Sequence, residues 1–564
     1  MLLNARRNEE SHAECFNIQD AFGMTSSIRD PANRVEMLRG PHAKEFIAAE
    51  IEEISNLYRM GMLKPITMDE LSPDDHVLRT TWSYKYKMES GEIKRFRSRW
   101  CARGDQESAS GLATFSAMAS TSCIRLLFCL LGKGLFRGVH LFDIGNAFAS
   151  APARRKVFVS QPPGYWDGTN TVFQLLRAFY GQRDAGRLFW LHLEDVLIKD
   201  GWKRSDADPC VWIKGSREDK NLAVLATHVD DILCFFQDER SATDLKKSLE
   251  DSFERIVHTP SPQHAIGMEI EYGEDYVKLH QLQYVENMNR KFSMDAETAW
   301  NTPVSSMQSD EETSLLNGID KTLYQQLVGS ILYLSSITRP DLAFATAMVA
   351  RGMSSPTEKD MKAVKRLIGH IWGTRHEGLT YTRSNTDACV TLNVFVDAEF
   401  AGDHADRRSS TGSCHRIDDM AVFSWRSGKQ RLTSKSSTES ELIALASETD
   451  DTVVYRQLLA DIGLLCFVPT PIYIGEPGDV ENAAAVIHED NSSAVVIVKD
   501  RLYGARTKFL DVRLRVLRER ERDRVLDLKL VGTKQQLADT FTKQLSVSDH
   551  KKWRQVLLYG GMLT

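Results

Sequence analysis

The stretch Leu222–Phe236, LAVLATHVDDILCFF, decides the fold of this chain. Two apolar runs of strand length and composition flank adjacent carboxylates, so the sequence predicts a hairpin with Asp230 and Asp231 at its turn. Adjacent carboxylates between apolar strands repel each other and lose hydration, which favours a bound cation. Oxygen ligands of this kind suit magnesium. Because Asp is also a common turn residue, an exposed turn is the alternative interpretation of these residues alone.

The composition is that of a soluble globular protein. The 564 residues are 42% hydrophobic and 26% charged, so several domains can each bury a core. A net charge of −6 means that a nucleic-acid partner has to be bound through local basic patches. The nine cysteines occur singly, which favours reduced thiols in a cytosolic or nuclear setting over zinc modules. The N-terminus lacks the apolar core of a signal peptide, and the longest apolar stretch, Cys123–Phe136, is too short for a membrane span.

The N-terminal region contains one predicted helix and one basic hairpin. Residues 1–40 are polar without periodicity and are predicted to be a loose leader. Glu45–Leu63 has apolar residues at helical spacing, which predicts an amphipathic helix. Thr80–Gly104 alternates like a strand and is expected to turn around Gly91 into a strongly basic return strand. These cations could keep an edge strand soluble, but their clustering favours the binding of phosphates.

A third acidic position, Asp143, follows an apolar strand that is predicted to end at Phe142. Small residues come next, and then Phe148. A carboxylate at a strand end, followed by backbone amides with little side-chain cover, suits metal and phosphate binding. An Asp after a strand can equally cap a helix.

These motifs, in this order and spacing, resemble the reverse transcriptase of copia-type retrotransposons. The segments that carry the resemblance are GEIKRFRSRWCARG, FDIGNAF, VFVSQPPGY, AFYGQRDAGRLFW (178–190) and HVDD. Three later segments, AIGMEIEY (265–272), YQQLVGSILYLSSITRPDLAFA (324–345) and GTRHEGLTYT (373–382), are similar to the region that follows in the same polyproteins. The resemblance extends over roughly residues 42–564.

The resemblance implies a polymerase shaped like a right hand, in which two metal ions join a primer 3′-hydroxyl to an incoming nucleotide. The implied metal ligands are the carboxylates of Asp143, Asp230 and Asp231 and the backbone carbonyl of Ile144.

The resemblance also implies a set of substrate contacts. Arg97 and Arg99 would hold the triphosphate, because bidentate guanidinium contacts suit phosphate. Phe148 stands where the family uses an aromatic ring to exclude a ribose 2′-hydroxyl. The segment that lines nucleotide and template would be represented by Tyr180, Gly181 and Arg183.

The last third carries four acids that match the carboxylates of a ribonuclease H fold in this family. Each alone would be a solvated charge, but together they can converge on two metal ions, whose activated water cleaves RNA. Asp397 is expected on a strand, Glu441 on a helix after a Ser/Thr-rich cap, and Asp490 at a strand end before a helix. Asp539 is expected on the C-terminal helix.

Four positions depart from the family pattern. His228 replaces a tyrosine and Gly186 a proline, which predicts an altered rate or fidelity of synthesis rather than its loss. Phe509 and Arg515 replace histidines within Arg501–Lys529, a densely charged segment near the expected hybrid. That segment could also be only an exposed, ion-paired helix. These two departures predict a less efficient nuclease.

The sequence therefore predicts an α+β multidomain protein. It comprises a leader (1–40), the fingers and palm of a right-hand polymerase (41–300), a thumb and connection (301–388), and a ribonuclease H-like α/β domain with a C-terminal tail (389–564). The expected activities are RNA-directed DNA synthesis and cleavage of RNA in RNA–DNA hybrids. Each site would use two Mg²⁺ ions, with Mn²⁺ as a substitute. Expected partners are an RNA template, a DNA primer, the hybrid and dNTPs, with no membrane.

The expected setting is transposition, in cytoplasmic particles of the element or in the nucleus. The chain shows no zinc-binding array, integrase-like region or protease motif, so it is either a processed piece or a copy that lost those parts. The alternative function is a degenerate or co-opted nucleic-acid-binding remnant without catalysis. The four departures favour that alternative, and retention of all the expected carboxylates opposes it. A multidomain protein with purely structural acids would need many coincidences of spacing.

Overall fold

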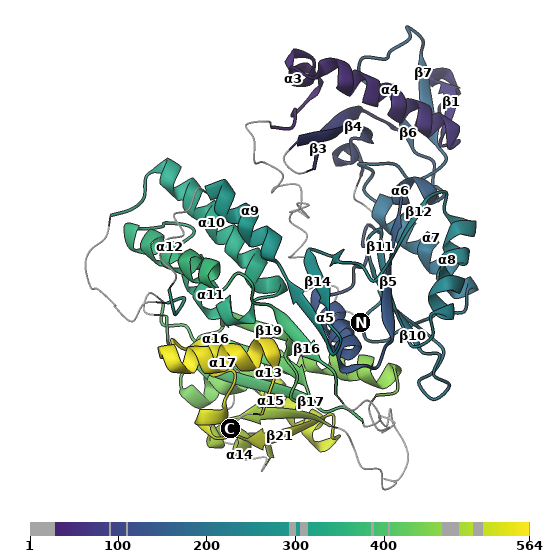
Figure 1. Ribbon diagram of the computed structural model, residues 1–564. Coiled ribbons are helices and arrows are strands. Elements are labelled where there is room, and N and C mark those ends of the chain that lie inside the picture. Colours follow the sequence, from purple (N-terminus) through teal and green to yellow (C-terminus); the bar gives the residue numbers. More distant parts are fainter. Residues whose placement is uncertain are drawn as a thin grey trace.

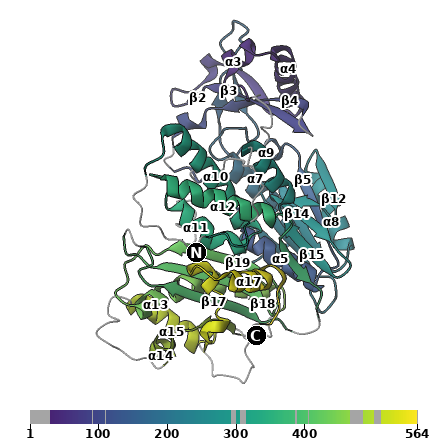
Figure 2. The same cartoon turned by 60° about the vertical axis from the view of Figure 1, so that its left-hand side comes forward.

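The computed structural model is a mixed α/β structure whose parts follow one another from the N-terminal elements at the top of Figure 1 to the C-terminal helices at its base. It describes residues 29–89, 92–108, 111–292, 300–304, 314–384, 389–403, 406–464, 484–499 and 511–562. The view turned by 60° shows the same order of parts (Figure 2). Among these residues, no helix combines the length and apolar character needed to cross a bilayer.

The predicted hairpin lies inside a six-stranded antiparallel sheet. In order across the sheet, the strands are β12 (Ile256–Pro260), β5 (Gly138–Ile144), β11 (Asp231–Phe236), β10 (Ala223–His228), β9 (Val211–Lys214) and β8 (Lys203–Arg204). His228 pairs with Asp231, so Val229 and Asp230 form a two-residue turn between β10 and β11. The hairpin prediction is confirmed.

Alternate residues of this hairpin enter two different cores, because successive side chains of a strand point to opposite faces. Val224 and Leu233 belong to one core, and Leu225 and Ile232 belong to the other. Burial on both faces explains why both runs are almost continuously apolar. Helix α5 (Thr121–Lys133) contributes to the first core, which extends into the C-terminal part of the chain, and α7 (Ala185–Lys199) and α8 (Arg240–Ser252) contribute to the second.

The N-terminal part combines a small sheet, a long hairpin and two helices. Its elements are α3 (Arg34–Arg39), α4 (Ala43–Arg59), the hairpin β3 (Thr80–Glu89) and β4 (Glu92–Ala102), and the sheet β1 (Leu63–Thr67), β7 (Thr171–Leu175), β6 (Phe158–Val159) and β2 (Val77–Leu78). The amphipathic helix and the basic hairpin form as expected, although the helix ends at Arg59 because β1 begins at Leu63. Gly91 lies outside the described residues.

The prediction of a loose leader over residues 1–40 is wrong for its last part. Residues 34–39 form α3, and the side chain of Asn33 caps it by accepting a hydrogen bond from the Glu36 amide. Arg34 then forms an ion pair of 3.1 Å with Glu50, whose side chain is fully buried on α4. This partner lies far away in the sequence, so the periodicity of the segment itself gives no sign of it.

A four-stranded sheet and a group of helices follow the six-stranded sheet in the chain. They are β13 (His264–Ala265), β14 (Met268–Tyr272), β15 (Tyr276–His280) and β16 (Leu379–Thr382), with α9 (Leu282–Phe292), α10 (Gly318–Ile337), α11 (Ala343–Ala350) and α12 (Glu358–Gly373). Since β15 pairs with β16, the sheet joins residues on both sides of the boundary predicted at residue 300. Val285 and Met288 of α9 share a core with α10 to α12.

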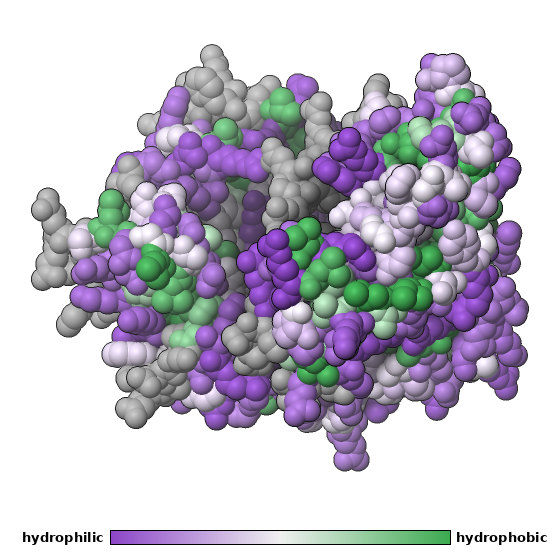
Figure 3. Space-filling model, turned by 90° about the horizontal axis from the view of Figure 1, so that it is seen from above, coloured by the Kyte–Doolittle hydropathy of each residue, from purple (hydrophilic) through white to green (hydrophobic). Residues whose placement is uncertain are grey.

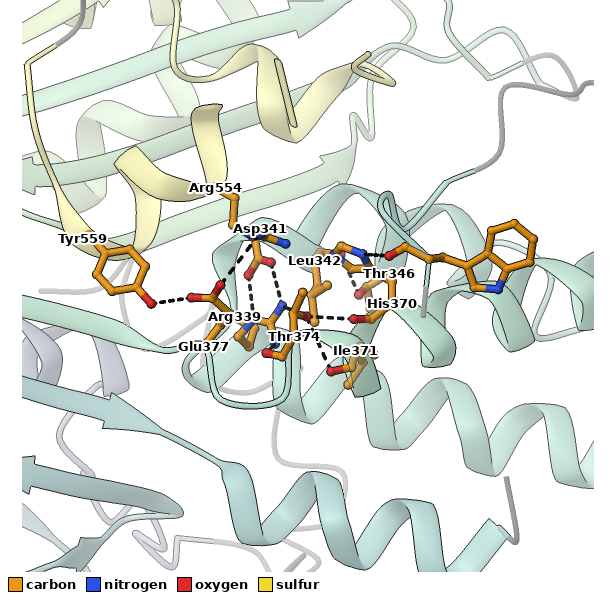
Figure 4. Close-up of polar contacts among 11 residues, drawn as sticks. Arg339, Asp341, Leu342, Thr346, His370, Ile371, Thr374, Glu377, Arg554 and Tyr559 are labelled. Atoms are coloured by element: carbon orange, nitrogen blue, oxygen red, sulfur yellow. Dashed lines mark hydrogen bonds and ion pairs between the residues drawn. The ribbon is translucent and has the colours of Figure 1, made fainter. Parts of the chain in front are cut away.

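A buried ion pair anchors this helical group. Arg339 Nη2 lies 2.7 Å from Asp341 Oδ2, and both side chains are essentially inaccessible to solvent. Arg339 also donates to the backbone carbonyl of Thr374 at the end of α12. Nearby, Glu377 accepts a hydrogen bond from Tyr559 of α17 (Val547–Tyr559), so the group is tied to the C-terminal helix (Figure 4). Burial alone would raise the pKa of Asp341, but Arg339 lowers it to about 2.

We expect Asp341→Asn to destabilise the protein by roughly 3–5 kcal/mol, because it leaves a buried guanidinium without its counter-charge. Since the pKa of Asp341 is lower in the folded chain than in the unfolded one, the ion pair stabilises the protein above about pH 4. That contribution disappears as the pH falls towards 2. Urea denaturation at pH 7 measures the loss.

Arg103 and Asp105 provide a matched control. They form another Arg–Asp pair two residues apart, with a distance of 2.6 Å, but both side chains are exposed. Asp105→Asn is therefore expected to change stability little. Equal losses of stability in the two variants would contradict the role given to the buried pair.

The C-terminal part is built on a five-stranded mixed sheet. Its strands, in order, are β19 (Val422–Lys429), β18 (Ser410–Ile417), β17 (Leu392–Glu399), β20 (Ala485–Glu489) and β21 (Leu526–Leu530). The first three run antiparallel, whereas β17, β20 and β21 run parallel. The helices here are α13 (Ser437–Asp461), α14 (Ser492–Lys499), α15 (Asp511–Arg522), α16 (Asp539–Thr542) and α17.

Candidate active sites

The first site lies where the end of β5 is beside the start of β11. Asp143 pairs directly with Asp231 across these strands, so the two carboxylates that are distant in the sequence become neighbours. Asp143 lies within β5, one residue before its end, rather than after the strand as predicted. Asp230 lies in the adjoining turn, and its carbonyl accepts a hydrogen bond of 3.0 Å from the amide of Ile144.

The turn itself is strained. Val229 has φ +58°, in the left-handed region that β-branched residues rarely adopt. Such strain persists only where the surrounding structure imposes it, and it is concentrated at functional sites. Here the β10–β11 pairing fixes the turn and holds Asp230 beside the other two carboxylates.

The electrostatics of this site favour a cation. Burial, followed by the charges of Asp230 and Asp143, raises the pKa of Asp231 to about 7. Burial and the Asp230 charge also raise the pKa of Asp143, while Arg255 and Arg97 oppose the rise. A divalent cation would relieve the repulsion that produces these shifts, and carboxylate oxygens are suitable ligands for it.

Two neighbouring arginines lie on β4, and the first of them is near these acids. The charge of Arg97 acts on Asp143, and burial and the neighbouring Arg99 lower the pKa of Arg97 itself. The Arg99 guanidinium lies 4.8 Å from the centroid of the Tyr180 ring. Its Nε is buried and has no hydrogen-bond partner within the described residues. Two adjacent guanidinium groups beside a carboxylate site form a natural receptor for a metal-bound phosphate.

The remaining predicted substrate residues lie around Tyr180. Phe148, on the short helix α6 (Ala147–Ser150), contacts the Tyr180 ring edge to face with 5.8 Å between centroids. Gly181 has φ +83°, and a Cβ there would lie 2.2 Å from the carbonyl oxygen of Ala102. Glycine is therefore required where this loop crosses β4.

Arg183, which is predicted to line nucleotide and template, makes two contacts within the chain. Its Nε donates to the carbonyl of Gly104 at 2.7 Å, and its amide donates to Glu107. The side chain thus fastens the loop to the end of β4. The sequence gives no sign of this contact, because it depends on how two loops meet.

The departures from the family pattern fit the structure locally. His228 is half-buried, and this burial lowers its pKa. Gly186 lies in the first turn of α7, where its carbonyl accepts a hydrogen bond from Ser116. Phe509 lies outside the described residues, and Arg515 is exposed on α15. Arg518 is only 9% exposed and donates to the carbonyl of Ile497, so it holds α15 against α14 rather than facing solvent.

The second site gathers acids from the five-stranded sheet and the helices beside it. Asp397 of β17 is 1% exposed and accepts a hydrogen bond from Thr542. Lys543 Nζ lies 2.8 Å from Asp539 and 3.4 Å from Asp397. Burial raises the pKa of Asp539 to about 6, against the hydrogen bond from Lys543. Asp539 begins the short helix α16, not the C-terminal helix as predicted.

Two groups of three acids meet at this second site. In each group, one ligand atom from every residue lies within 4.8 Å of the others, and Asp490 belongs to both. The groups are Asp397, Asp490 and Asp539, and Glu441, Glu489 and Asp490. Among the described residues, the three aspartates of the first site do not form such a group.

Glu489 is the acid that the sequence prediction missed. It ends β20 and is fully buried, so the alternation of that strand could have revealed it. Burial, followed by Glu489 and Asp397, raises the pKa of Glu441 to about 11. One carboxylate oxygen each of Glu441 and Glu489 has no hydrogen-bond partner in the described part of the chain. Clustered carboxylate oxygens of this kind fit a divalent cation such as Mg²⁺ or Mn²⁺.

The face of the molecule seen from above is mostly hydrophilic, with scattered apolar patches (Figure 3). The same view shows a hollow between the part that carries α9 and α10 and the part that carries β3 and β4 (Figures 1 and 3).

Comparison with known proteins shows consistent similarities. Residues 66–306 match the family model "Reverse transcriptase (RNA-dependent DNA polymerase)". The chain is 27% identical over 553 residues to the retrovirus-related Pol polyprotein from transposon TNT 1-94 of Nicotiana tabacum, covering 95% of this chain and 40% of that protein. It is 27% identical over 529 residues to the Pol polyprotein from transposon RE1 of Arabidopsis thaliana, covering 92% of this chain and 34% of that protein.

The chain thus spans well under half the length of these relatives. A solved structure of the foamy viral protease–reverse transcriptase in complex with double-stranded DNA is 10% identical, with a TM-score of 0.45, covering 86% of this chain and 69% of that one. The matched range 66–306 includes the segments from GEIKRFRSRWCARG to HVDD that carry the resemblance in the sequence. Residues 66–306 thus match the reverse transcriptase family, and most of the chain is homologous to Pol polyproteins of copia-type retrotransposons.

Proposed function

We propose that the chain is an RNA-directed DNA polymerase with an appended ribonuclease H. The observation that carries the polymerase assignment is the direct pairing of Asp143 with Asp231 beside the strained turn that holds Asp230. The match to the reverse transcriptase family supports the same activity. The substrates would be a primed RNA template and dNTPs.

In the polymerase site, each residue has a definite task. Asp143, Asp230 and Asp231 would hold two Mg²⁺ ions, which activate the primer 3′-hydroxyl and stabilise the leaving pyrophosphate when they are bound. Arg97 and Arg99 bind the triphosphate oxygens, because guanidinium groups match phosphate geometry. Loss of either arginine contact would misorient the triphosphate and therefore slow nucleotide addition.

In the nuclease site, the predicted acids would be Asp397, Glu441, Asp490 and Asp539. They would hold metal ions that supply an activated water to cleave the RNA strand. Thr542 and Lys543 fix the carboxylate of Asp397, and Lys543 also contacts Asp539. The two activities belong together chemically, since synthesis on RNA leaves a hybrid whose RNA has to be removed before a second DNA strand is made.

A non-catalytic remnant is the weaker interpretation. Buried carboxylates that lack partners are costly unless a cation compensates them. Glu441 and Glu489 each have one buried carboxylate oxygen without a hydrogen-bond partner in the described residues. A protein that binds no metal would be more stable with apolar residues at these two positions.

The proposal is tested by giving the chain an end-labelled RNA template annealed to a DNA primer labelled with a second dye. With Mg²⁺ and dNTPs, we expect the primer to lengthen and the RNA to be cut behind it. A chain that lengthens the primer but leaves the RNA intact would refute the nuclease half of the proposal alone.

Phe148→Ala should weaken discrimination against ribonucleotides. The ring lies beside Tyr180 and Phe189, and its removal opens space for a 2′-hydroxyl. We expect the ratio of kcat/KM for dNTP over rNTP to fall at least tenfold, or ~1.4 kcal/mol. Phe400→Ala, which removes a 43% exposed ring from the C-terminal part, serves as the control. An unchanged ratio in Phe148→Ala would remove Phe148 from the sugar-binding position.

A further inference from the structure

Glu489 has no task in the function proposed above, yet it lies against the nuclease acids. It is fully buried at the end of β20, immediately before Asp490. One of its carboxylate oxygens accepts a hydrogen bond of 3.0 Å from the Asn491 amide. The other has no hydrogen-bond partner among the described residues. Half of the carboxylate is therefore fixed by the backbone, and the other half is unsatisfied.

The unsatisfied oxygen belongs to a cluster. Ligand atoms of Glu489, Glu441 and Asp490 all lie within 4.8 Å of one another. Glu441 is 5% exposed and also has an oxygen without a hydrogen-bond partner in the described chain. Two buried, unpartnered carboxylate oxygens that converge would cost several kcal/mol if nothing bound them. Their arrangement points to a cationic ligand.

The neighbouring group of acids differs in this respect. Asp397 and Asp539 already contact the ammonium group of Lys543, and Asp397 also accepts from Thr542. Lys543 thus compensates the negative charge of the group with Asp397 and Asp539. The unpartnered oxygens belong to the group with Glu441 and Glu489. Asp490 is shared by both groups.

We propose that Glu489 is a fifth carboxylate of the nuclease site and that, with Glu441 and Asp490, it binds a divalent cation of the Mg²⁺ or Mn²⁺ class. The inference rests on the proposed ribonuclease H function and adds a ligand to it. An additional carboxylate raises the negative charge around the cation and supplies a further hard oxygen. The site should therefore hold its metal more tightly than four acids alone would.

The competing role for Glu489 is structural. A protonated Glu489 could donate a hydrogen bond to Glu441 and simply fill space in the interior. Glutamine preserves the shape and the ability to donate a hydrogen bond but lacks the charge. Glu489→Gln therefore separates a ligand from a spacer.

The experiment measures Mn²⁺ binding by the full-length chain, using the electron paramagnetic resonance signal of free Mn²⁺. All proteins carry Asp143→Asn, Asp230→Asn and Asp231→Asn, so that the polymerase site does not contribute. Glu489→Gln is added in one protein. Glu439→Gln is added in the control, because Glu439 lies on the same helix as Glu441 but bonds the amide of Lys435 instead.

We expect Glu489→Gln to weaken Mn²⁺ binding at least tenfold and Glu439→Gln to leave it unchanged. Equal affinity and stoichiometry in Glu489→Gln and its parent would overturn the proposal. If Glu489→Gln does not fold, Glu489→Asp, which keeps the charge but withdraws it by one methylene, replaces it. Undiminished Mn²⁺ affinity in Glu489→Asp would then overturn the proposal.

Hybrid cleavage by the otherwise unaltered chain separates this inference from the proposed function. If the chain cleaves the hybrid but Glu489→Gln leaves Mn²⁺ affinity unchanged, the proposed nuclease function stands and Glu489 is not a metal ligand. If the chain does not cleave the hybrid but Glu489→Gln lowers Mn²⁺ affinity, the metal site stands and the nuclease function is refuted.

Discussion

Asp230→Asn is expected to reduce primer extension by about a thousandfold, which corresponds to ~4 kcal/mol of lost transition-state stabilisation. Asparagine keeps the shape of the side chain in the turn but removes the charge that would hold a metal ion. The backbone contact of residue 230 with the Ile144 amide does not depend on the side chain, so the fold should survive. Extension of a DNA primer on an RNA template, with circular dichroism of both proteins, measures the effect.

Asp244→Asn is the matched control for this variant. Asp244 is an exposed aspartate on α8, in the same part of the chain, and its replacement removes one negative charge without touching the site. We expect extension at the parental rate. Wild-type rates in both variants would exclude Asp230 from the polymerase site.

Asp397→Asn is expected to abolish cleavage of RNA in a hybrid while primer extension on a DNA template continues at the parental rate. Asp397 is buried in β17 within the C-terminal sheet, and its hydrogen bond from Thr542 can be made equally well to an amide oxygen. The variant should therefore lose charge rather than structure. Glu441→Gln should give the same pattern, because its carboxylate faces the same cluster.

Asp523→Asn controls for the loss of a negative charge in the C-terminal part, since Asp523 is exposed and pairs only with the adjacent Arg522 among the contacts described. Cleavage should continue in this control. Parallel loss of cleavage and extension in a folded Asp397→Asn protein would mean that the two sites are not independent.

The pattern of the sequence was sufficient for the centre of the fold. In Leu222–Phe236, apolar residues occupy most positions, and the polar residues gather around the pair of aspartates at the centre. Local spacing therefore predicts two strands joined by a turn, and the structure contains this hairpin. The same spacing could not predict that Asp143 pairs with Asp231, since register between distant strands is decided by tertiary packing.

Contacts between distant segments account for what the sequence did not reveal. Arg34 of α3 forms an ion pair with Glu50, and the side chains of Arg183 and Arg518 donate to backbone carbonyls of distant segments. The family motif identifies Asp490 as the acid at this strand end and gives no indication of Glu489 beside it. Its burial could have been expected from strand alternation, but the missing partner of its oxygen depends on where α13 places Glu441.

The most direct test of the account is incorporation of dTMP by the purified full-length chain on poly(rA) primed with oligo(dT). We predict incorporation that requires Mg²⁺ or Mn²⁺, that stops when EDTA is added, and that Asp230→Asn reduces by about a thousandfold. A folded chain that binds the primed template but incorporates no dTMP with either metal would contradict the central claim.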